Sequence, residues 1–123
     1  MQTKGLVLSV DDYVPAAYSA FYNRKEQGTV ADYVIVMGYD EHFAGGAAGS
    51  VASLSYVENG ITDTLEEVPK EKLINSVPLY TRVWTEKDGK TISKAYGITA
   101  AQNWVEENNV EPDLAGQYWP VLW

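Results

Sequence analysis

The sequence predicts an α/β protein built on a parallel sheet, followed by a hairpin and a further helix. Three apolar, strand-like runs alternate with two segments of helical character, an order that is typical of parallel strands joined by helical crossovers. The central run, residues 32–40, is almost entirely apolar and β-branched, as in a parallel strand covered on both faces. With 123 residues, 46% of them hydrophobic, the chain can form one domain with a modest core.

The first half of the chain is expected to contribute two strands and two helices. Residues 5–10 read Gly-Leu-Val-Leu-Ser-Val, which indicates a buried strand. Pro15 opens a helical stretch that is expected to run to about Gln27 and to stop at Gly28. After the strand at 32–40, apolar residues recur at helical spacing over 55–68, and Pro69 ends that helix.

The second half changes character after one more strand. Residues 73–84 are predicted to form the third parallel strand, with Pro78 at an irregular position because proline cannot donate to a ladder. Asp88-Gly89 between two strand-like runs predicts a hairpin, and residues 99–108 predict a helix.

Composition excludes several classes of function. The net charge of −8 and pI of about 4.5 argue against nucleic acid and anionic membranes as partners. No apolar run approaches the roughly 20 residues that membrane insertion needs. The absence of cysteine excludes disulfides and thiolate metal sites, and no metal or cofactor site is predicted. Tyrosine and tryptophan dominate the aromatic residues, which suits sugar binding and an amphipathic core equally.

Candidate site residues lie at the ends of the second and third predicted strands. Met37 and Tyr39 share one side of their strand, and Asp40 falls at its carboxyl end, where parallel sheets bind ligands. Tyr80, Arg82 and Trp84 follow at a spacing of two, so they share one face. Such a mix of aromatic and charged groups suits a sugar cleft.

Structural roles remain open for these residues. Tyr39 could belong to the core while Asp40 caps a turn, and Arg82 could be paired with Asp40 because a buried arginine is costly alone. His42, the only histidine, is more typical of a loop residue than of a base. Glu41 lies beside Asp40, but adjacent residues rarely present both carboxylates to one sugar, so a two-carboxylate glycosidase pair is not expected.

The motifs resemble those of family 18 glycoside hydrolases. Residues 36–40, Val-Met-Gly-Tyr-Asp, are similar to the Met-x-Tyr-Asp motif on strand six of that family, and residues 51–68 to its sixth helix. Residues 77–84 resemble its strand-seven motif, Pro-Phe-Tyr-Gly-Arg-x-Trp. Residues 23–27 and 39–42 resemble the bacterial subgroup that acts in spore germination on cortex peptidoglycan.

The resemblance, which runs from about Gly5 to about Asn109, implies a partial (β/α)8 barrel, about strands five to seven. Residues 1–84 would form the barrel segment, and residues 85–123 part of an α+β insertion subdomain and a tail. The family motif Asp-x-x-Asp-x-Asp-x-Glu, which carries the general acid, is absent from the 123 residues. The chain alone is therefore expected to be inactive, and its three strands, with two open edges, are expected to associate as a homo-oligomer.

For the parent protein, the resemblance implies substrate-assisted retaining hydrolysis of an N-acetylhexosamine polysaccharide, chitin or peptidoglycan, without a cofactor. Tyr39 and Asp40 would be catalytic. Met37, Tyr80, Arg82 and Trp84 would bind the sugar. The parent is expected outside the cell or at the spore or cell wall. A non-catalytic carbohydrate-binding relative is the first alternative, and a phosphoacceptor receiver domain is a remote one.

Overall fold

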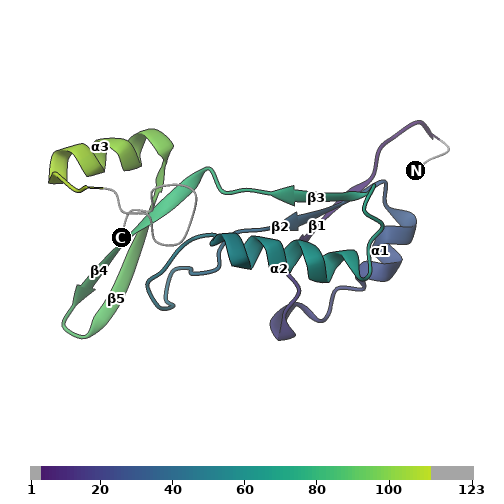
Figure 1. Ribbon diagram of the computed structural model, residues 1–123, viewed down its shortest axis with the longest axis horizontal. Helices are drawn as coiled ribbons and strands as arrows, with labels where there is room; N and C mark the ends of the chain where they lie inside the picture. Colours follow the sequence, from purple (N-terminus) through teal and green to yellow (C-terminus); the bar gives the residue numbers. More distant parts are fainter. Residues whose placement is uncertain (1–3, 112–123) are drawn as a thin grey trace. The chain divides into compact units, whose positions relative to one another are not determined.

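The computed structural model describes residues 4–111, which fall into two compact units (Figure 1). The first unit contains the chain up to Tyr39 and again from Ser55 to Val77. The second contains residues 40–54 and the chain from Pro78 onward. A three-stranded parallel sheet organises the first unit, and a two-stranded antiparallel hairpin organises the second.

The parallel sheet has the order β1-β2-β3, with β1 at Ser9–Tyr13, β2 at Tyr33–Met37 and β3 at Leu73–Ser76. The crossovers contain α1 (Arg24–Val30) and α2 (Leu54–Leu65), and α2 runs alongside the strands in Figure 1. The predicted α/β class with parallel strands is confirmed for this unit.

The core of the first unit lies on one face of the sheet. Val34 and Val36 on β2 are fully buried, and Ala31 and Val68 pack with Val34. On the opposite face the register aligns Ile35 with Ile74 of β3, and Ile74 is exposed. Ile35 itself is half-buried, so within the described residues the strand that was predicted to be covered on both faces is fully covered on one and partly covered on the other.

Two boundaries in the first unit differ from the prediction. The first strand starts at Ser9 rather than residue 5, and Leu6 and Val7 before it are exposed. The helix expected from Pro15 to Gln27 is replaced by a short 3-10 helix at Ala17–Ser19 and by α1, which Asn23 caps by accepting from the Glu26 N–H. Gly28 does not end α1. It allows close packing, since a Cβ there would lie 3.1 Å from Pro69 Cδ.

The single third strand predicted over residues 73–84 is wrong. β3 ends at Ser76, and a new strand, β4, spans Tyr80–Lys87 in the other sheet. Pro78 lies in the break, as expected of a residue without an N–H to donate. Tyr80, Arg82 and Trp84 therefore lie on the hairpin and not on the parallel sheet.

The predicted hairpin and last helix are confirmed. β4 pairs antiparallel with β5 (Lys90–Gly97). Asp88 and Gly89 connect them with φ values of 52° and 71°, the left-handed conformations that two-residue hairpin loops require. α3 spans Ile98–Asn108 and ends at Asn109, which is also left-handed.

In residues 4–111 no helix is long and apolar enough to cross a membrane. A receiver domain needs one continuous five-stranded parallel sheet, whereas the described residues form a three-stranded parallel sheet and a separate hairpin. The receiver alternative therefore does not fit.

Candidate functional site

Met37 and Tyr39 mark the carboxyl end of β2 in the first unit. Between them, Gly38 donates its N–H to the Ser76 carbonyl at 3.2 Å, and a Cβ at this position would overlap the Asn75 amide oxygen. Glycine is thus required where β2 passes β3. The Tyr39 side chain is half-buried, and its carbonyl accepts from the Tyr56 hydroxyl at 3.4 Å.

Asp40, Tyr80 and Arg82 form a polar cluster in the second unit. The Tyr80 hydroxyl donates to Asp40 Oδ1, and Arg82 Nη2 lies 3.9 Å from the same oxygen. The Arg82 guanidinium also lies 5.9 Å from the centroid of the Tyr80 ring and donates to Ser93 Oγ at 3.2 Å. The sequence-based expectation that Arg82 pairs with Asp40 is confirmed by this geometry.

The two charged side chains of this cluster differ in exposure. The Arg82 side chain is only 15% exposed, whereas the Asp40 side chain is 45% exposed. The carboxylate is therefore accessible to solvent, and the guanidinium beside it is largely buried. Arg82 Nε is buried and has no hydrogen-bond partner among the described residues. The arrangement can offer acceptors and donors to a polyhydroxylated ligand while an aromatic ring lies beside them.

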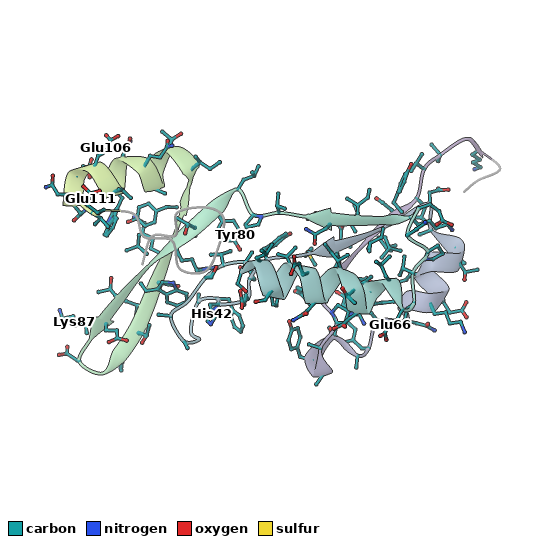
Figure 2. All side chains as sticks on the ribbon, in the orientation of Figure 1. His42, Glu66, Tyr80, Lys87, Glu106 and Glu111 are labelled. Carbon is teal, nitrogen blue, oxygen red and sulfur yellow. The ribbon has the colours of Figure 1, made fainter. Side chains whose placement is uncertain are left out.

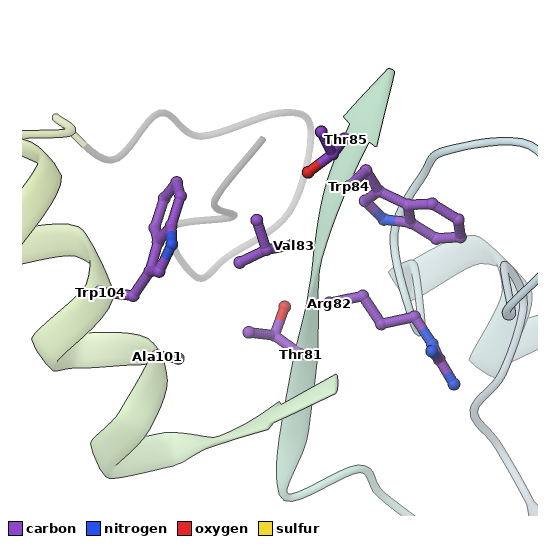
Figure 3. Close-up of a pocket in the computed structure, with 7 residues that line it drawn as sticks. All are labelled: Thr81, Arg82, Val83, Trp84, Thr85, Ala101 and Trp104. Carbon is purple, nitrogen blue, oxygen red and sulfur yellow. The ribbon is translucent and has the colours of Figure 1, made fainter. Parts of the chain in front are cut away.

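Trp84 projects from the same side of β4 as Arg82 (Figure 3). Its indole Nε1 donates to the Gly49 carbonyl at 3.2 Å, so it also anchors the loop of residues 40–54. Tyr80 lies near the start of β4 and Lys87 at its far end (Figure 2).

The opposite side of β4 carries Thr81 and Val83, which point towards Trp104 of α3 (Figure 3). A hollow of about 110 Å³ is lined by Thr81, Arg82, Val83, Trp84, Thr85, Ala101 and Trp104. Most of this hollow belongs to the face of β4 that carries no charge, and the polar cluster lies on the other face.

Glu41 and His42 have contacts that the sequence did not predict. Both Glu41 carboxylate oxygens accept hydrogen bonds from Ser53, one from its N–H at 2.7 Å and one from its hydroxyl at 2.9 Å. His42 Nδ1 lies 2.9 Å from the Ser50 carbonyl. The His42 ring also fills the space where a Cβ of Gly49 would lie. Both residues therefore organise the 40–54 loop.

A second polar cluster, which the sequence analysis did not predict, is buried in the first unit. Asp12 is fully buried on β1, accepts from Gln27 Nε2 at 2.9 Å and lies 3.9 Å from Arg24 Nε. Arg24 Nη2 donates to the Tyr13 carbonyl and to the Ser19 hydroxyl, both at 3.0 Å. Burial raises the pKa of Asp12, although the Gln27 hydrogen bond and the Arg24 charge oppose the rise.

The described part of the chain contains no group of three or more His, Cys, Asp and Glu side chains that could hold a metal ion. The Asp40 cluster offers hydrogen bonding, charge and aromatic contact from its own side chains.

Sequence comparison relates the chain to bacterial glycosylases, although no family model matches it. It is 37% identical over 70 residues to YvbX of Bacillus subtilis, named as a glycosylase, which covers 57% of this chain and 20% of that protein. It is 36% identical over 90 residues to YdhD of the same organism, named as a sporulation-specific glycosylase. That match covers 68% of this chain and 21% of YdhD. The chain thus spans about a fifth of the curated relatives it matches.

Solved structures extend the similarity over nearly the whole chain. The crystal structure of YdhD matches with a TM-score of 0.86 and 26% identity, over 95% of this chain and 40% of that one. A chitinase from Chromobacterium violaceum matches with a TM-score of 0.84 and 25% identity, over 95% and 38%. A family GH18 chitinase from Cycas revoluta shares the fold at 23% identity and a TM-score of 0.68, over 86% and 39%.

The fold and the motifs are thus those of chitinase-like glycoside hydrolases. The resemblance to family 18 glycoside hydrolases, first indicated by residues 36–40 and 77–84, is confirmed by these relatives, which include a bacterial glycosylase named for sporulation.

Proposed function

We propose that this chain is the cleft-lining segment of a glycoside hydrolase that cleaves an N-acetylhexosamine polysaccharide, chitin or peptidoglycan. β1, β2 and β3 correspond in this proposal to strands five, six and seven of a (β/α)8 barrel. Residues 1–77 are assigned to the barrel segment, which is shorter than the predicted 1–84 because Tyr80–Lys87 form β4 of the hairpin. Residues 78–123 are assigned to part of an α+β insertion with its tail, of which residues 112–123 lie outside the described part of the chain. The general acid is supplied by a part of the protein outside these 123 residues.

The proposed reaction is substrate-assisted and retaining. The carbonyl oxygen of the sugar's N-acetyl group attacks the anomeric carbon while the general acid protonates the leaving oxygen, so the glycosidic bond breaks and an oxazolinium ion forms. Water then attacks the anomeric carbon and gives its proton to the deprotonated general acid, while the bond between that carbon and the N-acetyl oxygen breaks and the N-acetyl group is restored. The hydroxyl of Tyr39 donates to the N-acetyl oxygen, and Asp40 contacts polar groups beside the cleaved bond. Both residues lower the barrier by positioning.

The remaining predicted residues bind the polysaccharide. Met37 lines the floor of the pocket beside Tyr39. Arg82 and Tyr80 hold sugar hydroxyls, and Trp84 offers its ring face to a pyranose.

The observation that carries the proposal is the Asp40 cluster. Tyr80 and Arg82 both contact one oxygen of a half-exposed carboxylate, which leaves the other carboxylate oxygen available to a ligand. Asp40 also holds a left-handed backbone conformation, with φ of 60°, and such conformations are concentrated at functional sites.

Tyr39→Phe in the full-length protein tests the catalytic role. Removing one positioned hydrogen bond is expected to lower kcat about 10²-fold, or roughly 3 kcal/mol, on an N-acetylglucosamine oligomer. KM should change little, because the interaction strengthens towards the transition state. The melting temperature is the folding control. A kcat within about twofold of wild type would assign Tyr39 to the core instead.

The same cleft could serve a non-catalytic carbohydrate-binding protein. Binding of N-acetylglucosamine oligomers by the full-length protein without any turnover would favour that alternative. The 123-residue chain alone is expected to show no turnover.

The chain alone is also expected to self-associate, since β1 and β3 are both edge strands within the described sheet. Light scattering at micromolar concentration measures this, and a monodisperse monomer contradicts the proposed homo-oligomer.

A further inference from the structure

Asp40 holds a backbone conformation that needs support. Its φ of 60° is in the left-handed region, which costs most residues other than glycine on the order of 1 kcal/mol, costs aspartate less, and is stabilised by neighbouring contacts. Tyr80 and Arg82 hold the side chain of Asp40, but side-chain contacts alone do not fix the backbone.

The next residue supplies the missing support. The Glu41 N–H donates to the Val51 carbonyl at 2.9 Å, and Val51 is buried. The Glu41 carboxylate binds Ser53 through both of its oxygens. These are charge-assisted hydrogen bonds, which are stronger than neutral ones. Glu41 thus closes the base of the 40–54 loop directly beside Asp40.

Two further contacts stiffen the rest of the loop. His42 Nδ1 pairs with the Ser50 carbonyl at 2.9 Å, and Trp84 Nε1 donates to the Gly49 carbonyl at 3.2 Å. The loop is therefore closed by Glu41, braced by His42 and tied to β4. Trp84 ties the loop to β4, the strand that also carries Tyr80 and Arg82.

We infer that Glu41 is a positioning residue, which holds the Asp40 carboxylate over Tyr80 and Arg82 by clamping Ser53. Both oxygens of Glu41 accept from Ser53, which favours this positioning role over acid or base catalysis on the sugar. The inference rests on the proposed function, since it assigns to Glu41 the task of orienting a group that contacts substrate. It also explains why a second carboxylate adjoins Asp40 in the sequence.

The test compares variants of the full-length protein on a fluorogenic N-acetylglucosamine trimer. Glu41→Ala is expected to lower kcat about tenfold and to change KM less than twofold, because it misplaces a group used in the reaction step. Glu41→Gln, which keeps one carbonyl acceptor for Ser53, should recover part of the loss. Glu66→Ala, at an exposed glutamate just beyond α2, is the matched control and should match wild type.

A double variant separates positioning from general damage. If Glu41 acts through Asp40, adding Glu41→Ala to Asp40→Ala should lower kcat no further, whereas independent effects multiply. Multiplied losses, or a Glu41→Ala kcat equal to wild type, would overturn the inference while leaving the role of Asp40 intact. Full activity of Asp40→Ala would instead overturn the proposed role of Asp40, and the inference with it.

If Glu41→Ala does not fold, Glu41→Gln and Ser53→Ala still decide the question. Each removes part of the clamp, and each should lower kcat about threefold in the wild-type background and not in the Asp40→Ala background. Equal effects in both backgrounds would contradict the inference.

Discussion

Two aspartate–arginine pairs in this chain share the same separation and differ in their surroundings. Asp12 and Arg24 in the first unit lie 3.9 Å apart with side-chain exposures of 0% and 4%, whereas Asp40 and Arg82 in the second unit lie 3.9 Å apart with 45% and 15%. Distance alone therefore does not distinguish a structural pair from one that can meet a ligand. The burial of the two side chains and their remaining hydrogen-bond partners distinguish the two kinds of pair.

The buried pair is built into the backbone around it. Arg24 binds the Tyr13 carbonyl and Ser19, while Asp12 binds Gln27, so every strong contact is internal. In the exposed pair, Asp40 contacts two side chains and keeps an accessible carboxylate. We therefore expect the first pair to matter for stability and the second for activity.

The largest expected effect comes from removing the buried arginine. Arg24→Met should lower the free energy of unfolding by about 3–5 kcal/mol, because it leaves Asp12 buried and unpaired. Arg82→Met should lower it by no more than about 1 kcal/mol, because its partner is solvated. Urea unfolding of both variants measures the difference. Similar losses in the two variants would remove the basis for treating the pairs differently.

The same two substitutions should rank in the opposite order for activity. Arg82→Met is expected to lower kcat/KM of the full-length protein about 10²-fold, roughly 3 kcal/mol, through lost sugar contacts and a displaced Asp40. Arg24→Met should lower it less than about threefold per folded molecule. Arg82→Lys should restore little, because an ammonium group cannot contact Asp40 and Ser93 with a planar fork. Full activity of Arg82→Met would mean that this pair too is structural.

Only the pair of Asp40 and Arg82 was predicted from the sequence, and the reason is physical. Arg82 drew attention because it lies between Tyr80 and Trp84 on an apolar strand, and its pairing with Asp40 followed from the cost of burying a charge. Asp12 follows the apolar run at residues 5–10, so no local pattern marked it as buried. It lies inside β1, which spans Ser9–Tyr13, and contacts Arg24 and Gln27 of α1.

Other features follow from tertiary contacts that no local pattern reveals. Gly28 was expected to end a helix, but its lack of a side chain allows packing against Pro69. Residues 73–84 have continuous strand character, yet they divide between two sheets around Pro78. The Asp88-Gly89 hairpin was predictable because its left-handed turn depends on those two residues alone. Glu41 could not be assigned, because its partner Ser53 lies twelve residues away.

The smallest expected effect concerns pH and distinguishes the two aspartates further. Burial raises the pKa of Asp12 above its ordinary value of 3.8, so the folded protein holds that proton more tightly than the unfolded chain. The stability that protonated Asp12 contributes is therefore fully present below pH 3.8 and is lost as pH rises through the raised value. The loss of unfolding free energy is at most about 1.4 kcal/mol for each pH unit in that window.

Asp12→Asn should flatten this part of a plot of melting temperature against pH. Asp63→Asn, which removes an exposed carboxylate from α2, is the control for loss of one charge. An unchanged slope in Asp12→Asn would show that Asp12 is solvated in the folded state, and the contrast between a sealed pair and an open one would then rest on Arg24 and Arg82 alone.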